Sequence, residues 1–246
     1  MSKFNKSQWS KKDYAYEYLE KVDIQLMDRR KLIEILKSFY TQFLACTKKN
    51  NILDLGCGDG IIARELIMAD CNISAVLVDA SSDMILKAKE KMTNFKNIQF
   101  IQADIRNLFE NHLKNDKFDF IVSSFAIHHL NLNEKKVLYD SIYNHLNDGG
   151  FFVNIDVVKS PSKELEGWYL NLWREYIINK QSEFKLKGEY LDAIEKHSNS
   201  EHYETLDTLT DQLSALKKSG FEGVDCFYKH GIFSMFGGRK QSTMNE

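Results

Sequence analysis

Residues 51–60 are Asn-Ile-Leu-Asp-Leu-Gly-Cys-Gly-Asp-Gly, and this stretch decides the fold. The apolar run 51–55 has the length and composition of a strand that is buried on both faces of a sheet. The glycines after it allow a tight turn and a close approach to a ligand, and Ile62, Leu66 and Ile67 continue as one face of a helix. The start of that helix offers free N–H groups to a polar or anionic ligand. The sequence therefore predicts a strand, a ligand-binding loop and a helix.

The glycine spacing separates this loop from the fingerprint of dinucleotide-binding proteins. That fingerprint is Gly-x-Gly-x-x-Gly, but Ile61 stands at the position of its third glycine, after Gly56 and Gly58. Asp54, two residues before the first glycine, is also foreign to the fingerprint. A nicotinamide-dependent oxidoreductase is therefore disfavoured.

Four further apolar runs follow, and helix-patterned stretches separate them. The runs cover residues 73–78, 98–101, 118–122 and 151–158, and the helical patterns between them include 84–92 and 137–146. Ser82 and Asp83 are typical residues of a helix N-cap, and 147–150 (Asn-Asp-Gly-Gly) is typical of a helix end. Strands and helices alternating at this pitch predict parallel pairing with right-handed crossovers. The expected fold class is α/β, a Rossmann-like doubly wound sheet.

The whole chain, residues 1–246, is predicted to form a single domain with four parts. These are an N-terminal helical cap (1–49), a ligand-binding core (50–159), a helical lid inserted after the fifth strand (160–204), and a C-terminal helix with a strand pair (205–238). The last two strands, near 224–228 and 232–236, are joined by only three residues. So short a connection predicts that they pair antiparallel.

Composition excludes several classes of protein. The 33 Lys and Arg residues against 35 Asp and Glu leave a net charge of −2, which argues against a nucleic-acid partner. No apolar run approaches the roughly 18 residues of a membrane span, and residues 1–12 lack the apolar segment of a secretory signal. The four cysteines form no CxxC pair, which favours reduced thiols in a cytoplasmic protein and no metal site.

Acidic residues end three successive predicted strands. Asp54, Asp79 and Asp104 lie 25 residues apart, each at the carboxyl edge of the sheet, where ligands of such folds bind. Asp79 can accept both hydroxyls of a ribose and Asp104 an exocyclic adenine amino group, at about 1.5–3 kcal/mol for each such bond. The alternative is that these acids only cap helices.

Together these motifs resemble those of the class I S-adenosylmethionine-dependent methyltransferases. Residues 54–60 look like the first motif of that family, Asp79 like its ribose-binding acid, 103–105 like its adenine-side motif, 123–130 like the segment after strand four, and 149–152 like the start of strand five. The resemblance covers about residues 9–238. It implies a seven-stranded sheet with the last strand antiparallel and S-adenosylmethionine as the cofactor.

The resemblance also implies a set of cofactor-binding residues, spread over the N-terminal segment, the glycine loop and the ends of the strands. They are Trp9, Tyr18, Arg30, Asp54, Gly56, Cys57, Gly58, Asp79, Ala80, Met84, Ala103, Asp104, Ile105 and Ser123. The segment around Tyr18 is similar to the one whose tyrosine often closes over the cofactor. Arg29 or Arg30 is expected to meet the carboxylate of the methionine part.

His128 and His129 fall at the mouth of the fourth strand, beside the expected methyl group. Methyl transfer from a sulfonium is a displacement in which the enzyme mainly holds the two reacting centres in line. A histidine there can also take a proton from the acceptor. The alternative is that the pair only caps a helix or packs inside, and the sequence does not rank one histidine above the other.

The insertion is expected to cover the pocket and to select the acceptor. Residues 160–204 hold nine acids and six bases with many aromatics, which suits an uncharged or cationic small molecule. The predicted function is a cytoplasmic methyltransferase that transfers a methyl group to a small-molecule acceptor. The sequence leaves open the acceptor and whether its reacting atom is O, N or C. It also leaves open the oligomeric state, with which a homodimer is compatible.

Two alternative functions would use the same cofactor. Trp173-Arg174, 219–221 and 226–228 weakly resemble the carboxy-S-adenosylmethionine synthases that serve tRNA modification. Those enzymes are expected to hold the extra carboxylate with an arginine of the inserted region, but this chain has no arginine between Arg174 and Arg239. The other alternative is a non-catalytic protein that binds S-adenosylmethionine as a partner or sensor.

Overall fold

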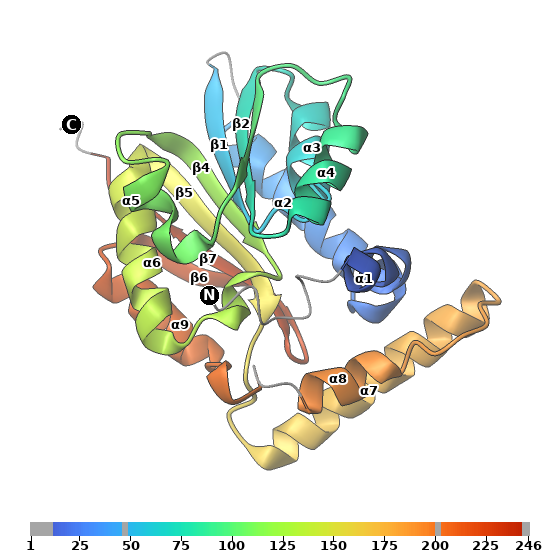
Figure 1. Cartoon of the computed structure of the whole chain (residues 1–246). Coiled ribbons are helices and arrows are strands. Elements are labelled where there is room, and N and C mark those ends of the chain that lie inside the picture. Colours follow the sequence, from blue (N-terminus) through green and yellow to red (C-terminus); the bar gives the residue numbers. More distant parts are fainter. Residues whose placement is uncertain (1–11, 46–48, 200–202, 243–246) are drawn as a thin grey trace.

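The computed structural model describes residues 12–45, 49–199 and 203–242 and contains one seven-stranded sheet (Figure 1). The strands lie in the order β3-β2-β1-β4-β5-β7-β6. They are β1 (Asn50–Leu55), β2 (Ile73–Asp79), β3 (Ile98–Gln102), β4 (Phe118–Ser124), β5 (Leu146–Val157), β6 (Glu222–His230) and β7 (Phe233–Arg239). Strands β1 to β5 are parallel, and β7 pairs antiparallel with both β5 and β6. The predicted doubly wound sheet with an antiparallel last strand is confirmed.

Helices cover both faces of the sheet (Figure 1). One face carries α2 (Arg29–Phe43), α3 (Ile61–Ala69) and α4 (Ser82–Lys91), and the other carries α5 (Leu108–Asn111), α6 (Leu132–His145) and α9 (Leu209–Lys218). Because side chains alternate along a strand, Ile52 of β1 packs in the first of these layers and Leu53 in the second. This two-sided burial explains why Ile52 and Leu53, which are neighbours in the strand, are both apolar.

Two local predictions were wrong by a few residues. The N-cap of α4 is Ser81, whose hydroxyl accepts a hydrogen bond from the Met84 amide, so Ser82 and Asp83 lie inside the helix. The helix end that was expected at 147–150, leading into a strand, lies slightly earlier: α6 ends at His145 and β5 begins at Leu146. Backbone hydrogen bonds between this segment and Lys240 extend the strand beyond its apolar part.

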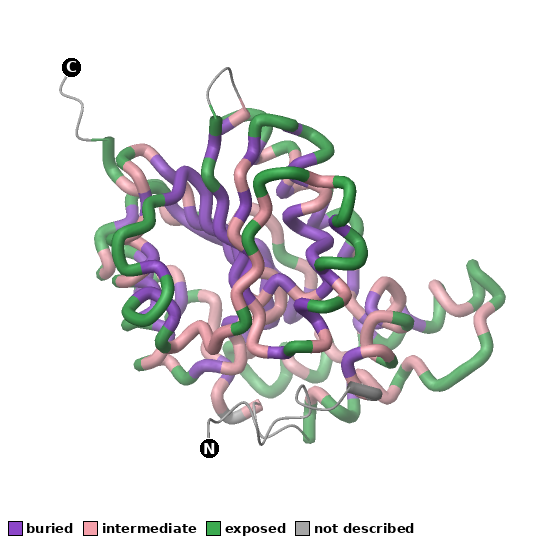
Figure 2. The backbone as a smooth tube through the Cα atoms, turned by 45° about the horizontal axis from the view of Figure 1, so that its top comes forward, coloured by how far each residue is buried: buried purple, intermediate pink, exposed green. Residues whose placement is uncertain are grey.

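The insertion after β5 forms two helices, as predicted. Helices α7 (Lys163–Glu183) and α8 (Asp192–Ser198) make a hairpin that projects from the body of the molecule (Figure 1) and is exposed or half-buried over most of its length (Figure 2). Trp173 anchors the hairpin: it packs on Phe233 and donates a 2.6 Å hydrogen bond to the carbonyl of Gln25 at the end of α1 (Lys12–Gln25). The hairpin therefore packs against the N-terminal helix through a small apolar cluster of its own.

Gly237 is a close-packed point of the sheet, because β7 lies between β5 and β6. A Cβ at this position would lie 2.0 Å from the Phe152 carbonyl oxygen of β5, so Gly237→Ala should lower the free energy of unfolding by about 3 kcal/mol or more. Gly167→Ala is the matched control, since Gly167 lies in α7 with open space around it. Alanine there should raise the free energy of unfolding by about 0.5–1 kcal/mol. Urea unfolding followed by circular dichroism measures both changes, and equal midpoints would contradict this account.

Candidate functional site

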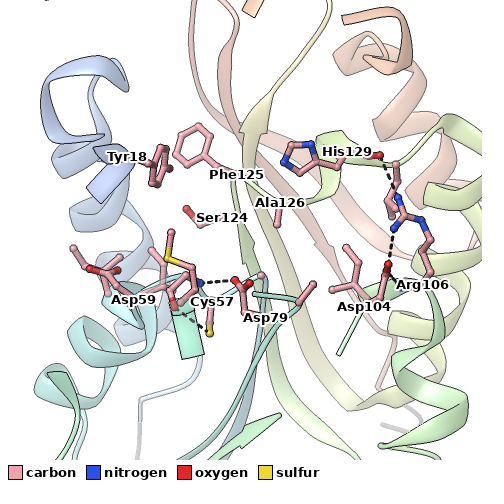
Figure 3. A pocket seen from close by; sticks show the side chains of 18 of the residues that line it. Tyr18, Cys57, Asp59, Asp79, Asp104, Arg106, Ser124, Phe125, Ala126 and His129 are labelled. Carbon is pink, nitrogen blue, oxygen red and sulfur yellow. Dashed lines mark hydrogen bonds and ion pairs between the residues drawn. The ribbon is translucent and has the colours of Figure 1, made fainter. Parts of the chain in front are cut away.

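A cavity of about 410 Å³ opens at the carboxyl edge of the parallel strands (Figure 3). Its lining comes from the ends of β2 and β4, from the loops after β1, β2, β3 and β4, from the first turns of α2, α3, α4 and α6, from α1, and from Thr205. The residues of the predicted site that line it are Tyr18, Gly56, Cys57, Gly58, Asp79, Ala80, Met84, Asp104, Ile105 and His129. Residues from distant parts of the sequence therefore meet in one space, as the sequence predicted for ligands of this sheet type.

The glycine loop forms the floor of the cavity. The amides of Gly56 and Cys57 donate hydrogen bonds of 2.8 and 2.9 Å to the Val78 carbonyl, which holds the loop against the end of β2. Gly56 has φ +70°, and a Cβ there would lie 2.2 Å from that of Ala126. Gly58 has φ +54°, and a Cβ there would meet no protein atom within 4 Å. Gly58 therefore leaves space in which a ligand can approach the backbone.

Asp79 stands at the end of β2 beside this loop. Its carboxylate accepts the amide of Gly58 at 2.9 Å and the amide of Ser81 at 2.8 Å, one on each oxygen. Burial raises the pKa of Asp79, and these backbone amides partly offset that effect. Because each carboxylate oxygen can accept more than one hydrogen bond, Asp79 can still bind two hydroxyl groups of a ligand.

Asp54 lies beneath the loop and does not line the cavity, contrary to the expected ligand contact. Its side chain is fully buried, and burial raises the pKa of its carboxyl to about 7, an effect that the Ala63 amide opposes and the nearby Asp79 and Asp59 reinforce. The residue two positions before the first glycine points into the protein because side chains alternate along β1.

The opposite end of the cavity holds Asp104 and a cation that the sequence analysis missed (Figure 3). Arg106 donates its amide and its guanidinium to the Asp104 carboxylate at 3.0 and 2.8 Å, and its Nε lies 3.3 Å from Glu134. The sequence did contain a signal for Arg106, since it stands two residues after Asp104, the acid that the sequence analysis had already placed in the site. Ala103 is outside the cavity, because its amide bonds to the Asp79 carbonyl and its side chain packs in the core.

The two candidate arginines of α2 lie on different sides of the helix. Arg29 lines the cavity, is only 8% exposed and is ion-paired with Asp23. Arg30 pairs with the same acid but its side chain is 59% exposed and does not reach the cavity. Adjacent residues of an α-helix point about 100° apart, so only one of them can face the site. Of the two, the geometry places Arg29 there.

A similar alternation separates Ser123 from Ser124 and His128 from His129. Ser123 is fully buried and donates to the Leu55 carbonyl at 2.8 Å, whereas Ser124 lines the cavity. His128 does not line it: its Nδ1 lies 2.6 Å from Asp156 Oδ1, and its amide donates to the other oxygen of that carboxylate. His129 does line the cavity. The sequence could not show which residue of each pair faces the cavity.

The lid contributes less to the cavity than expected. No described residue of 160–199 lines it, and the later Thr205 is the contribution from this part of the chain. The predicted cofactor residue Trp9 lies outside the described residues. Further lining residues that sequence reasoning missed are Leu19, Asp59, Ile61, Ile62, Phe125, Ala126, Leu130, Asn131 and Glu134. Within the ranges that the structure describes, no cluster of three or more His, Cys, Asp or Glu could hold a metal, and no helix is long and apolar enough to cross a membrane.

Comparison with known proteins identifies the type of domain. Residues 52–150 match the sequence family described as "Methyltransferase domain". A carboxy-S-adenosyl-L-methionine synthase from Shewanella sediminis is 26% identical over 207 residues, which cover 80% of this chain and 78% of that protein. A malonyl-(acyl-carrier protein) O-methyltransferase from Ilyobacter polytropus is 32% identical over 103 residues, which cover 42% of this chain and 36% of that protein.

Solved structures share the fold at low sequence identity. An O-methyltransferase family protein from Burkholderia thailandensis superposes with a TM-score of 0.68 and 10% identity, over 98% of this chain and 64% of that one. Human N-acetylserotonin methyltransferase, solved in complex with S-adenosylmethionine, superposes with a TM-score of 0.60 and 15% identity, over 95% of this chain and 58% of that one. The chain thus spans about three fifths of these two solved chains. The resemblance drawn from the motifs is confirmed.

The buried Asp54 should make stability depend on pH. Its pKa is about 7 in the folded protein against an ordinary 3.8, so the folded state keeps a proton that the unfolded chain has lost between these values. The free energy of unfolding should therefore fall as pH rises from about 4 to about 7, by at most roughly 4 kcal/mol from this group. Asp54→Asn removes the buried charge and this dependence.

The free energy of unfolding of Asp54→Asn should accordingly exceed that of the wild-type protein by more at pH 8 than at pH 5. Urea unfolding at the two pH values measures it, and Asp116→Asn, at an exposed carboxylate, is the matched control. An advantage that is the same at both pH values would contradict the assignment of a raised pKa to Asp54.

Proposed function

We propose that this chain, whose residues 52–150 match a methyltransferase domain, binds S-adenosylmethionine and transfers its methyl group to a small-molecule acceptor. The observation that carries the proposal is the meeting of Gly58, Asp79 and Asp104 in one cavity. These are a backbone that a ligand can approach, a carboxylate for a diol and a second carboxylate for an amino group. Adenosine presents such a diol and such an amino group at its two ends.

The remaining lining residues fit the rest of that ligand. Ala80, Met84 and Ile105 add apolar surface to the lining, which suits a purine ring. Arg29 places a buried cation beside the loop, where it can meet a carboxylate while it stays paired with Asp23. We therefore assign the amino-acid part of the ligand to the region of Arg29 and Tyr18, and the adenine to the region between Met84 and Ile105.

Once bound, S-adenosylmethionine supplies an electrophilic methyl group on a positively charged sulfur. The residues of the chain then have to hold an acceptor in line with that methyl and remove its proton where it has one. His129 lines the cavity and is the histidine that can contact the acceptor. His128 is tied to Asp156 at two points and acts through its neighbour, as a positioning residue.

A second candidate is carboxy-S-adenosylmethionine synthesis, which the matched span of its relative favours. Synthesis of that product requires a cation for an additional carboxylate. Of the two arginines that line the cavity, Arg29 is assigned above to the carboxylate of the amino-acid part and Arg106 is paired with both Asp104 and Glu134, and none of the described residues 160–199 reaches the cavity. Methyl transfer therefore remains the better-supported function.

Mass spectrometry of the small molecules that co-purify with the protein tests the choice between these functions. S-adenosylmethionine or S-adenosylhomocysteine is the expected result. The carboxylated cofactor would support the second candidate instead. A nicotinamide dinucleotide would contradict both.

Asp79→Ala should remove most of the affinity for S-adenosylmethionine. The variant loses two charge-assisted hydrogen bonds to the ribose as well as the contact that holds the Gly58 amide, at roughly 3–5 kcal/mol or several hundredfold in Kd. Calorimetric titration measures it, with Asp116→Ala at an exposed site as the control and circular dichroism to show that the fold is kept. A Kd within about threefold of wild type would remove Asp79 from the site.

The two histidines should respond differently to alanine substitution. His129→Ala should keep the affinity for S-adenosylmethionine and lose about 10²–10⁴-fold in kcat, because it removes the base that faces the cavity. His128→Ala should instead lower the melting temperature, since it removes the imidazole that pairs with the buried Asp156 and leaves that carboxylate only backbone donors. Turnover is followed by homocysteine release, on an acceptor found by screening small amines, phenols and acids. Unchanged kcat in His129→Ala would contradict its role as a base.

A further inference from the structure

Phe125 has a strained backbone at the site. Its φ is +54°, a left-handed conformation that glycine adopts readily and that costs other residues roughly 1–2 kcal/mol. It directly follows the last residue of β4, and its amide still donates to the Ile155 carbonyl of β5 at 2.8 Å. The chain thus keeps its pairing with β5 while it turns the side chain away from the direction that an extended strand would give. Strain of this kind is retained where the surrounding structure enforces it.

The ring of Phe125 is held from behind. It packs edge-on against Phe233 of β7, with ring centroids 6.1 Å apart, and Phe233 is fully buried. Phe233 in turn packs on Trp173, which anchors the α7–α8 hairpin to α1. The side of the Phe125 ring that faces away from the cavity is therefore occupied by packed aromatic side chains.

On its other side Phe125 lines the cavity. Figure 3 shows its side chain pointing into the cavity toward Tyr18, over the part of the floor that Ser124 and Cys57 form. The position matters for the ligand proposed above, because the sulfonium joins the ribose to the amino-acid part. With the ribose at Asp79 and the amino-acid part at Arg29, the sulfonium lies between them, at the end of β4.

We propose that Phe125 is the residue that limits the size of the alkyl group on the sulfonium, so that the site accepts methyl and excludes larger groups. This inference rests on the proposed function and adds a specificity-determining residue to it. The ring is backed by Phe233 and turned into the cavity by a backbone conformation that costs stability, so a larger alkyl group has to displace it. Displacing a packed ring is as unfavourable as overfilling a protein core.

Calorimetric titration with S-adenosylmethionine and with its S-ethyl and S-allyl analogues tests the proposal without a known acceptor. The wild-type protein should bind the analogues about ten- to a hundredfold more weakly than S-adenosylmethionine. In Phe125→Ala the Kd of each analogue should come to within about threefold of the Kd for S-adenosylmethionine in the same variant. Phe100→Ala, at a half-buried phenylalanine of β3 outside the cavity, should keep the wild-type ratio.

Two results would overturn the inference while leaving the proposed function in place. They are equal binding of all three ligands by the wild-type protein, and an unchanged ratio in a folded Phe125→Ala variant. Failure of the wild-type protein to bind S-adenosylmethionine would instead overturn the proposed function, and the inference with it.

Phe125→Gly supplies a second variant that also lacks the ring but suits the positive φ. It should melt a few degrees above Phe125→Ala, by about 2–8 °C, because glycine is relaxed at this position and alanine is strained. It should show the same gain in binding of the S-ethyl and S-allyl analogues. If Phe125→Gly melts below Phe125→Ala, or binds the analogues no better than wild type does, the proposed role of Phe125 is wrong.

Discussion

The two hydrogen bonds from the amides of Gly56 and Cys57 to the Val78 carbonyl are the contact on which the site depends. They hold the loop after β1 against the end of β2, and this places the Gly58 amide within reach of Asp79. The same loop can lie this close to β4 only because Gly56 has no Cβ to collide with Ala126. The floor of the cavity, the Asp79 carboxylate and the end of β4 are thus fixed relative to one another by backbone contacts.

Much of this arrangement could be predicted because it follows from local patterns. Apolar runs ending in Asp79 and Asp104, and a glycine loop after the first run, indicate parallel strands whose ends meet at one edge. What the sequence could not determine is which of two neighbours faces the cavity. Arg29 and Arg30 are equivalent in the sequence, and the packing of α2 on the sheet decides between them. In the same way, only the structure at the end of β4 shows that Ser124 faces the cavity and that Ser123 is buried.

The prediction for the inserted segment was right about its helices and wrong about where they would lie. The amphipathic pattern around Trp173 and Ile177 specifies that one face of α7 is buried, but not against what. In the structure that face packs on Phe233, Met27 and the end of α1 rather than over the cavity. The apolar surface available on α1 and β7 determined the outcome, and it arises only after the sheet has formed.

The hairpin is attached to the fold away from the loops that would bind the nucleoside. Among the described residues, Gln25 at the end of α1 bonds to both helices of the hairpin region, through its carbonyl to Trp173 and through its side chain to Asp192. The residues that would bind the nucleoside lie elsewhere, on the loops after β1, β2 and β3. Substitutions that accumulate on α7 and α8 therefore leave the nucleoside contacts untouched. The described residues of the hairpin can change without replacing any residue of the cavity lining.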